Sequence, residues 1–310
     1  MIAMTVPEPL KQGDRVALIA PCAPVLPERL AFAAEFIAGL GYVPEIYPSC
    51  SARLGFLAGD DSLRAGDINR AFADPAIRAV VVVRGGYGGA RLADLLDYDV
   101  IRTNPKVFTG FSDATALHIL IRQRCGLVTF HAPMPAAANF RDDGFTHKAL
   151  ADALSGRWAG EYGNPFPERN AGVPLECVFE GSCEGLLTGG NLTIVASTAG
   201  TPYQLDCREK ILFLEDVGEY AYAIDRALLH LRHSGILDGC RGVILGTWTD
   251  CAAPSDMPIS LTLRNALEPL GIPVISGLQG GHSVPSVFLP LGMRAAMVSS
   301  ENGCSIRIQA

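Results

Sequence analysis

The sequence predicts an α/β protein of two domains: an N-terminal, Rossmann-like domain built on a parallel sheet, and a smaller C-terminal α/β domain that is richer in strands. Three observations support this prediction. The first half alternates short apolar runs with amphipathic segments of helical length. The runs are apolar on both faces, which is typical of parallel strands covered by helices on both sides. The chain has 310 residues, which is longer than the length over which a single hydrophobic core usually extends.

The first half supplies strands and helices in strict alternation. Strands are predicted at 15–20, 43–47, 79–83 and 107–109, and helices at 27–40, 62–73, 90–96 and 114–124. Ligands of parallel sheets bind beyond the carboxyl ends of the strands. The loop after Val83 and the turn at Ser112 lie at that end, so both are candidate binding elements.

A change of composition separates the two halves. Gly, Pro, Asn and charged residues replace the periodic pattern over 156–174, which predicts domains at 1–160 and 174–310 with a linker at 161–173. The second half is expected to contain strands at 177–187, 211–214, 242–245, 274–276, 295–299 and 305–308, and helices at 223–233 and within 257–270.

Charge and cysteine content exclude several classes of partner. The net charge of −7 and the pI near 5.4 argue against a protein that binds nucleic acid or anionic membranes through a basic surface. No window is long and apolar enough to span a bilayer, and the start of the chain lacks the pattern of a secretory signal, so we expect a cytoplasmic protein. The nine cysteines have no CxxC spacing and are expected to be reduced.

The stretch FTGFSDATALHILI (residues 108–121) puts Ser112 at a sharp corner between a strand and a helix. Such a corner can expose a hydroxyl beside the first free N–H groups of the helix, as a nucleophile requires. The same position suits a helix N-cap, which is the commoner role of a serine there. This stretch by itself favours capping.

A glycine-rich loop follows the apolar run AVVVV. It reads RGGYGGAR, from Arg84 to Arg91. Glycines let a backbone come close to a ligand, and their N–H groups can face a phosphate or a developing oxyanion. The loop matches neither GK[ST] nor GxGxxG in the expected register, so a plain tight turn remains the alternative.

Two further candidates are a carboxylate and a histidine. Glu215 follows the apolar run ILFL, which anchors it at a strand end, and His282 lies in the glycine-flanked loop GLQGGHS. The other histidines fall on or beside predicted helices, except His131, which follows a strand and is expected to line the same cleft: His118, His131, His147, His230 and His233. With Ser112, these residues supply a nucleophile, an orienting acid and a general base, although spacing alone does not establish a triad.

Carboxylates near Glu215 leave a metal site open as an alternative. Asp216, Glu219 and Asp225 follow it closely and could bind a hard cation. Glu219 and Asp225 are expected instead to cap and flank the next helix, so no metal is predicted. We select Glu215 over Glu219 as the partner of the histidine because a strand end holds a side chain more firmly than the turn after it.

Several motifs in order give the chain a resemblance to a known family. They are GDRVALIAP, the segment 56–92, FTGFSDATALH, GLLTGGNLTIV, ILFLEDVGEYAYAIDR and GGHSVPSVFLPLG. Together they resemble the LD-carboxypeptidases, serine peptidases of the S66 type, which include the microcin C7 self-immunity peptidases. The resemblance implies a two-domain α/β enzyme, usually a homodimer, with no metal or organic cofactor.

The resemblance also implies roles for individual residues. Ser112 would be the nucleophile, Glu215 the triad acid and His282 the general base. The family cleaves an amide between an L-centre and a terminal D-residue, typically the D-alanine of a murein tetrapeptide.

Other residues would bind the reacting groups. The resemblance implies an oxyanion hole formed by the backbone N–H groups of Asp113 and of the Gly85 and Gly86 turn. Arg84, beside these glycines, is expected to hold a substrate carboxylate, with a structural ion pair as the equal alternative.

Three alternative functions remain open at this point. An immunity peptidase needs an aromatic side chain to stack on a nucleotide, and the tryptophans are Trp158 in the predicted linker and Trp248, which is expected to pack; we therefore favour a muropeptide substrate. A non-catalytic phosphate or nucleotide module would use residues 85–89. Metal-dependent hydrolysis would use the carboxylates around Glu215. The residue at position three of the peptide, diaminopimelate or lysine, is left open.

Overall fold

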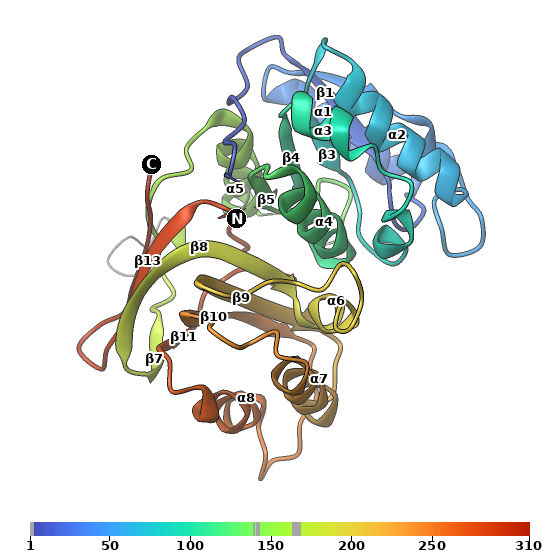
Figure 1. Cartoon of the computed structure of the whole chain (residues 1–310). Helices are drawn as coiled ribbons and strands as arrows, with labels where there is room; N and C mark the ends of the chain where they lie inside the picture. The colour runs from blue at the N-terminus through green and yellow to red at the C-terminus, as the bar shows by residue number, and fades with distance from the viewer. Residues whose placement is uncertain (1–2, 139, 141–142, 163–168) are drawn as a thin grey trace. The chain divides into compact units, whose positions relative to one another are not determined.

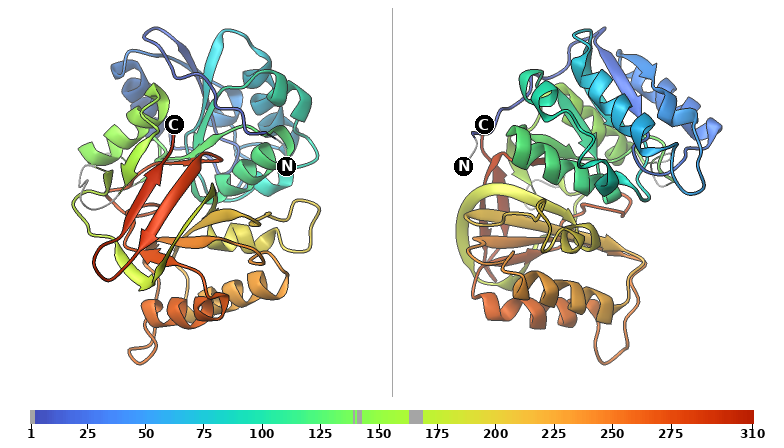
Figure 2. Two further views of the ribbon diagram at one scale, coloured as in Figure 1. Left: turned by 60° about the vertical axis from the view of Figure 1, so that its left-hand side comes forward. Right: turned by 45° about the vertical axis from the view of Figure 1, so that its right-hand side comes forward.

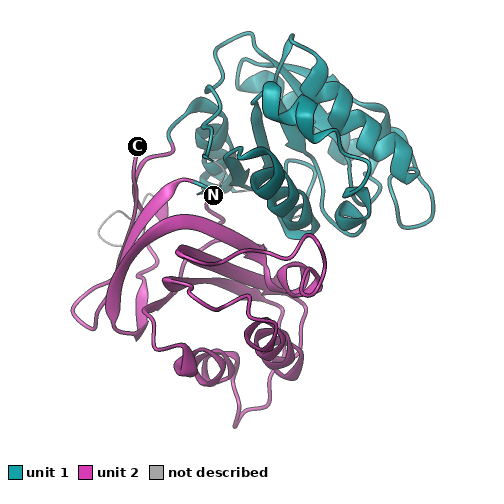
Figure 3. Cartoon of the chain, in the orientation of Figure 1, with its two compact units in different colours: residues 1–157, 288–292 teal, residues 158–287, 293–310 magenta. Residues whose placement is uncertain are grey.

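Two separate β-sheets organise the chain in the computed structural model, which describes residues 3–138, 140, 143–162 and 169–310. Each sheet belongs to one compact unit. Unit 1 comprises Met1–Arg157 and Phe288–Gly292, and unit 2 comprises Trp158–Val287 and Met293–Ala310 (Figure 3). Of the predicted linker at 161–173, residues 163–168 lie outside the described residues, and β6 (Gly160–Tyr162) is a strand of the sheet of unit 2.

The sheet of unit 1 is six-stranded, in the order β12-β5-β4-β3-β1-β2. Its strands are parallel except β12, which runs antiparallel to β5. The bounds are β1 (Arg15–Ile19), β2 (Val43–Ile46), β3 (Ile77–Val82), β4 (Val107–Gly110), β5 (Thr129–His131) and β12 (Leu289–Leu291). The predicted parallel sheet is confirmed. Within β3 only Arg78 is exposed, as its continuous apolar run predicts.

Helices cover both faces of this sheet. They are α1 (Pro27–Gly39), α2 (Asp61–Ala73), α3 (Tyr98–Thr103), α4 (Thr115–Cys125) and α5 (Gly144–Ser155). The strand order reverses at β1, so right-handed crossovers put α1 on one face and α2, α3 and α4 on the other. The helices α2, α3 and α4 lie side by side (Figure 1), and α1 meets α5 through the rings of Phe36 and His147, whose centroids are 5.0 Å apart.

The prediction of a helix at 90–96 is wrong. A short 3₁₀ turn, η2 (Gly89–Leu92), occupies its start, and α3 begins later, at the N-cap Asp97. Asn69 of α2 explains the break, because its side chain donates to the Leu95 carbonyl at 2.9 Å and accepts from the Asp97 N–H at 2.9 Å. These long-range bonds take the groups that a continuous helix would pair internally.

The sheet of unit 2 is eight-stranded and mixed, in the order β6-β14-β13-β8-β9-β10-β11-β7. Its centre, from β8 to β11, is parallel, and the flanking pairs are antiparallel. The remaining bounds are β7 (Glu176–Phe179), β8 (Gly181–Asn191), β9 (Lys210–Val217), β10 (Gly242–Thr249), β11 (Val274–Ser276), β13 (Arg294–Ser299) and β14 (Ser305–Ile308). The predicted single strand at 177–187 is two strands, divided at Glu180, and the second begins at Gly181, whose φ is +139°.

The described residues of unit 2 also form the α-helices α6 (Leu192–Ser197), α7 (Ala221–His233) and α8 (Ile259–Leu267). The helices α7 and α8 lie side by side against one face of the sheet, as the orange helices of Figure 2 show. Each helix formed by the described residues is too short, or too rich in charge, to cross a bilayer.

Candidate functional site

The residues singled out from the sequence fall into two groups. Ser112, Asp113, Arg84, Gly85 and Gly86 belong to unit 1. Glu215 and His282 belong to unit 2. Each group is described within its own unit, as the first half-site in unit 1 and the second half-site in unit 2.

The loops of the first half-site follow β1, β3 and β4. The strand order of unit 1 reverses between β1 and β3, and a crevice for ligands forms at such a reversal, beyond the carboxyl ends of the strands. The segment 20–24 follows β1 and the glycine-rich segment 84–89 follows β3, so both stand at this point. The two are bonded directly, since the Ala23 N–H donates to the Gly85 carbonyl at 3.1 Å.

Ser112 has a strained backbone. It is the first residue of the 3₁₀ turn η3 (Ser112–Ala114), separated from the end of β4 by one residue, and has a φ of +62°, which is rare for a residue with a Cβ. Such a conformation costs about 1–3 kcal/mol and persists only where the surroundings impose it. A sharp, strained turn from strand to helix is the usual mounting of an exposed nucleophile.

The expected capping role of Ser112 is wrong. The positions that precede η3 and α4 are Phe111 and Ala114, and neither provides a side-chain cap. Ser112 is instead the first residue of η3, with a half-buried side chain.

Two glycines bring the loop backbone against this serine. A Cβ on Gly85 would lie 2.9 Å from the Cβ of Ser112 and 3.1 Å from its Oγ. Gly86 has a φ of +113°, and a Cβ there would lie 2.4 Å from the Cβ of Ala23. Both positions therefore require glycine, one for contact with the serine and the other for contact with the loop after β1.

Histidines near Ser112 have structural roles. His118 of α4 is fully buried, and its Nε2 lies 2.8 Å from the Gly110 carbonyl. Burial lowers the pKa of His118 to about 4, so the neutral ring donates to that carbonyl at neutral pH. His131 does not line an open cleft: it is 1% exposed within β5, with its ring 5.7 Å from that of Phe111.

Arg84 makes a backbone contact, and no ion pair to it is found among the described residues. Its guanidinium donates to the carbonyl of Pro24, in the loop after β1, and the side chain is partly exposed. This bond ties the end of β3 to the end of β1. Contact of Arg84 with a substrate carboxylate stays a prediction.

The second half-site contains a carboxylate bonded to an imidazole. Glu215 lies in β9 and is fully buried, and its Oε2 is 2.8 Å from Nδ1 of His282. An ionised carboxylate only accepts hydrogen bonds, so Nδ1–H of His282 is the donor in this pair. The His282 side chain is 16% exposed, so a reactant can reach it. Burial raises the pKa of Glu215, and the bond from His282 opposes that rise.

The backbone around this pair leaves it little freedom. Gly281 has a φ of +116°, and a Cβ there would lie 2.3 Å from Oε2 of Glu215. The loop of His282 is fixed to β10, because the Thr247 N–H donates to the Gly280 carbonyl at 3.0 Å. The carboxyl ends of β9, β10 and β11 thus bring the acid and the base together.

The neighbouring carboxylates point elsewhere. Asp216 accepts from Nδ2 of Asn191 at 2.7 Å and from the N–H and hydroxyl of Thr193 at 3.0 and 2.8 Å, which ties it to the start of α6. Glu219 lies in the turn after β9, and Asp225 is exposed on α7. Across the described residues, no three His, Cys, Asp or Glu side chains are grouped to hold a metal ion.

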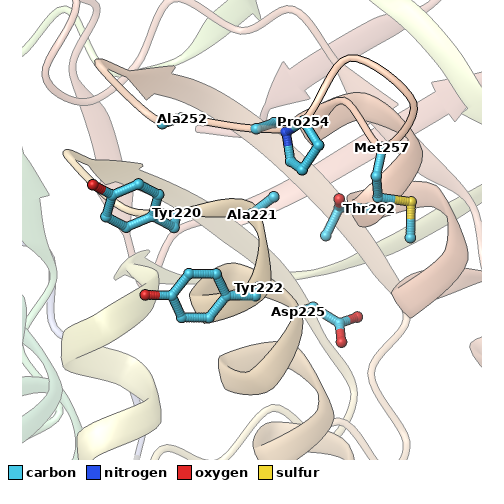
Figure 4. A pocket seen from close by; sticks show the side chains of 9 residues that line it. Tyr220, Ala221, Tyr222, Asp225, Ala252, Pro254, Met257 and Thr262 are labelled. Atoms are coloured by element: carbon cyan, nitrogen blue, oxygen red, sulfur yellow. The ribbon is translucent and has the colours of Figure 1, made fainter.

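An apolar pocket opens beyond the carboxyl ends of β9 and β10 (Figure 4). Its volume is about 560 Å³, within the range of small-molecule sites. Tyr220 and Tyr222 stack on its rim, with centroids 5.5 Å apart and ring planes at 13°, and are 58% and 66% exposed. This aromatic surface was not predicted from the sequence, although the pattern YAY at the start of a helix signals it. The full lining is Tyr220, Ala221, Tyr222, Asp225, Ala252, Ala253, Pro254, Met257 and Thr262.

A strained serine, a glycine-rich loop and a buried carboxylate bonded to histidine are parts of a hydrolase. The family model of the LD-carboxypeptidase N-terminal domain matches residues 16–132, and that of the LD-carboxypeptidase C-terminal domain matches residues 184–297. The chain therefore belongs to the LD-carboxypeptidases, the S66 family of peptidases.

Relatives and solved structures are similar to this chain over nearly its whole length. A probable murein peptide carboxypeptidase of Bacillus subtilis is 38% identical over 299 residues, covering 95% of this chain and 92% of the relative. The crystal structure of muramoyltetrapeptide carboxypeptidase from Oxalobacter formigenes has a TM-score of 0.83 at 30% identity and covers 96% of this chain and 99% of that one. An MccF-like protein from Bacillus anthracis has a TM-score of 0.86 at 27% identity, with 99% of both chains covered.

The burial of His118 predicts a dependence of stability on pH. Its pKa falls from about 6.5 in the unfolded chain to about 4 in the folded one, so only the unfolded state takes up a proton between these values. The contribution of the neutral ring to the free energy of unfolding is complete above pH 6.5. About 3 kcal/mol of it is lost as the pH falls to 4. Urea denaturation of the wild type and His118→Gln at pH 7, 5.5 and 4.5 measures it. We expect the free energy of unfolding of His118→Gln to fall less steeply with decreasing pH than that of the wild type.

His230→Gln is the matched control for this measurement. His230 is exposed on α7, so the variant should follow the wild type at every pH. Parallel curves for His118→Gln and the wild type would contradict the assignment of a buried neutral ring.

Proposed function

We propose that this protein is a serine-type LD-carboxypeptidase that releases the terminal D-amino acid, D-alanine, from murein tetrapeptide. Ser112 is the nucleophile, His282 the general base and Glu215 the residue that orients it. The observation that carries the proposal is the φ of +62° at Ser112, a strained conformation with the side chain against Gly85. Strain of this kind is retained at functional sites, whereas a serine that only packs has no need of it.

The proposed reaction is an acyl transfer in two steps. Nε2 of His282 takes the proton of Ser112 as Oγ attacks the carbonyl carbon of the scissile amide. Glu215 holds Nδ1–H in place and stabilises the imidazolium. His282 then gives its proton to the leaving amine, so the amino acid departs and an ester remains on Ser112. A water, deprotonated by His282, attacks the ester and restores the serine.

The oxyanion of each tetrahedral intermediate needs donors. We assign this role to the backbone N–H groups of Asp113 and of the Gly85 and Gly86 turn. The first N–H groups of a helix lack acceptors inside the helix, and Asp113 is the second residue of η3. The contact between Gly85 and Ser112 supports the same assignment.

Substrate, assembly and location are inferred from relatives. The names of the relatives from Bacillus subtilis and Oxalobacter formigenes refer to murein peptides, which supports a muropeptide substrate. We further propose a cytoplasmic homodimer that needs no metal or organic cofactor, as the resemblance to the family implies.

A second candidate activity is the cleavage of a peptidyl-nucleotide amide. Its support is the similarity to the MccF-like protein and the exposed stack of Tyr220 and Tyr222, which offers the aromatic surface that a nucleobase requires. A phosphate-binding module has weaker support, because the Gly89 N–H already donates to the carboxylate of Asp113 at 2.7 Å.

Replacement of Ser112 tests the nucleophile. We expect Ser112→Ala to lower the kcat for D-alanine release by at least about 10⁴-fold, because no other group can form the acyl-enzyme. Mass spectrometry of tetrapeptide digests measures product, and circular dichroism checks the fold. Ser62→Ala, at an exposed serine of α2, is the control and should keep full activity. Turnover by Ser112→Ala at the wild-type rate refutes the proposal.

Replacement of Glu215 tests the orienting acid. Glu215→Gln keeps the shape of the side chain but removes the charge that fixes the Nδ1–H tautomer of His282. We expect kcat to fall by about 10³- to 10⁴-fold with little change in KM. Asp216→Asn is the control: it should lower stability by loosening α6 and leave kcat within about threefold. Equal kinetic losses in the two variants would argue against a specific role for Glu215.

The two substrate classes are separated by a comparison at Tyr222. We expect wild-type kcat/KM to be higher for tetrapeptide than for a peptidyl-nucleotide amide. Should the nucleotide activity be the real one, Tyr222→Ala would lose about tenfold on that substrate alone, since one base stacked on an aromatic ring contributes about 1–3 kcal/mol. Tyr222→Phe keeps the ring, and Leu229→Ala changes another exposed side chain of α7; both serve as controls.

A further inference from the structure

Two buried charged side chains lie behind the glycine-rich loop, and neither takes part in the proposed chemistry. Asp113 is 3% exposed and Arg64 is fully buried. We propose that the Asp113 carboxylate and the Arg64 guanidinium are positioning groups that hold segment 85–89, so that its N–H groups meet the oxyanion formed at Ser112. This inference rests on the proposed function.

The carboxylate of Asp113 joins the nucleophile to the loop. It belongs to the residue after Ser112, and its Oδ2 accepts from the Gly89 N–H at 2.7 Å. The fit is close, because a Cβ on Gly89 would lie 3.0 Å from the carbonyl oxygen of Asp113 and 3.1 Å from Oδ2. Burial raises the pKa of the Cys22 thiol, in the loop after β1, and the nearby carboxylate of Asp113 raises it further. The side chain of Asp113 therefore fixes the glycine-rich loop to the loop that carries Ser112.

Arg64 holds the same loops from α2. Its Nη1 donates to the Gly88 carbonyl at 3.0 Å and also to the Pro21 carbonyl. Its Nη2 pairs with Asp61, which binds the exposed Arg91 as well, at 2.7 Å. The guanidinium thus bridges the loop after β1 and the loop after β3.

The two ends of segment 85–89 are fixed by different means. At its start, Gly85 contacts Ser112 and Gly86 contacts Ala23. At its end, Gly88 and Gly89 are bonded to Arg64 and Asp113. Tyr87, between them, is 53% exposed. A shift of the second pair would move the first, because only one residue separates them.

Stability is a weak explanation for these two charges. Burial of a charged side chain carries a desolvation penalty that can exceed the gain from its contacts, so a buried Arg and a buried Asp are weak evidence for a role in folding. Their bonds go mainly to backbone groups of loops beside Ser112, and a guanidinium with its planar fork of donors fixes such groups in direction as well as distance.

Kinetics of Asp113→Asn and Arg64→Lys test the proposal. Both variants should lower kcat for D-alanine release by about 10- to 100-fold with KM within about threefold, because the loss of one oxyanion donor costs about 10²- to 10³-fold and a displaced donor costs less. The affinity for a peptide boronate, which forms a tetrahedral adduct with Ser112, should fall by the same factor as kcat. The affinity for an uncleaved substrate analogue should not change.

Asp67→Asn is the matched control. Asp67 is a fully buried aspartate of α2 that accepts from the Ser49 N–H at 2.7 Å, away from the glycine-rich loop. It should lower the free energy of unfolding and leave kcat and boronate affinity as in the wild type. Gly89→Ala provides a test that removes no charge: its methyl group must displace the loop from Asp113, so kcat and boronate affinity should fall together.

Two results would overturn the inference. One is that Asp113→Asn loses stability, as Asp67→Asn does, while its kcat and boronate affinity keep wild-type values. If Asp113→Asn does not fold, the same result for Gly89→Ala counts instead. The other is a rise in KM without a change in kcat, which would make Asp113 a substrate-binding group. A failure of the proposed function itself shows separately, as full activity of Ser112→Ala.

Discussion

The positive φ of Ser112 is the constraint on which the first half-site depends. Its backbone is unfavourable by about 1–3 kcal/mol in isolation, so neighbouring groups must offset this cost. They do so from several sides. Gly110 packs closely against Val82, because a Cβ on Gly110 would lie 2.9 Å from the Cβ of Val82. His118 binds the Gly110 carbonyl, and Gly85 lies against the side chain of Ser112. Small or uncharged groups therefore hold the strained residue in place.

In unit 2 the corresponding constraint is electrostatic. Burial disfavours the charged form of Glu215. The hydrogen bond from Nδ1–H of His282 opposes this effect and stabilises the carboxylate. Parallel strands explain why the two meet, since the register puts the ends of β9, β10 and β11 at one edge of the sheet. Asp216, one residue further along β9, faces the opposite side of the strand and binds α6 instead.

Much of this arrangement follows from local sequence, and the exceptions share a cause. Apolar runs and the residues that end them predicted the parallel sheet, the corner at Ser112 and the strand end at Glu215. The helix at 90–96 failed because Asn69, more than twenty residues earlier, takes its hydrogen bonds. Arg64 was missed because its neighbours in sequence give no sign that it points into the core, and its acceptors belong to two distant loops.

In both half-sites, features that fix the geometry of the side chains and backbone also lower the stability of the fold. Gly85, Gly86 and Gly281 add backbone entropy to the unfolded chain, and Asp113 and Glu215 bury carboxylates whose pKa rises in consequence. In the proposed mechanism each of these features fixes a donor, an acceptor or the nucleophile within its own unit, so that less reorganisation is needed there during the reaction.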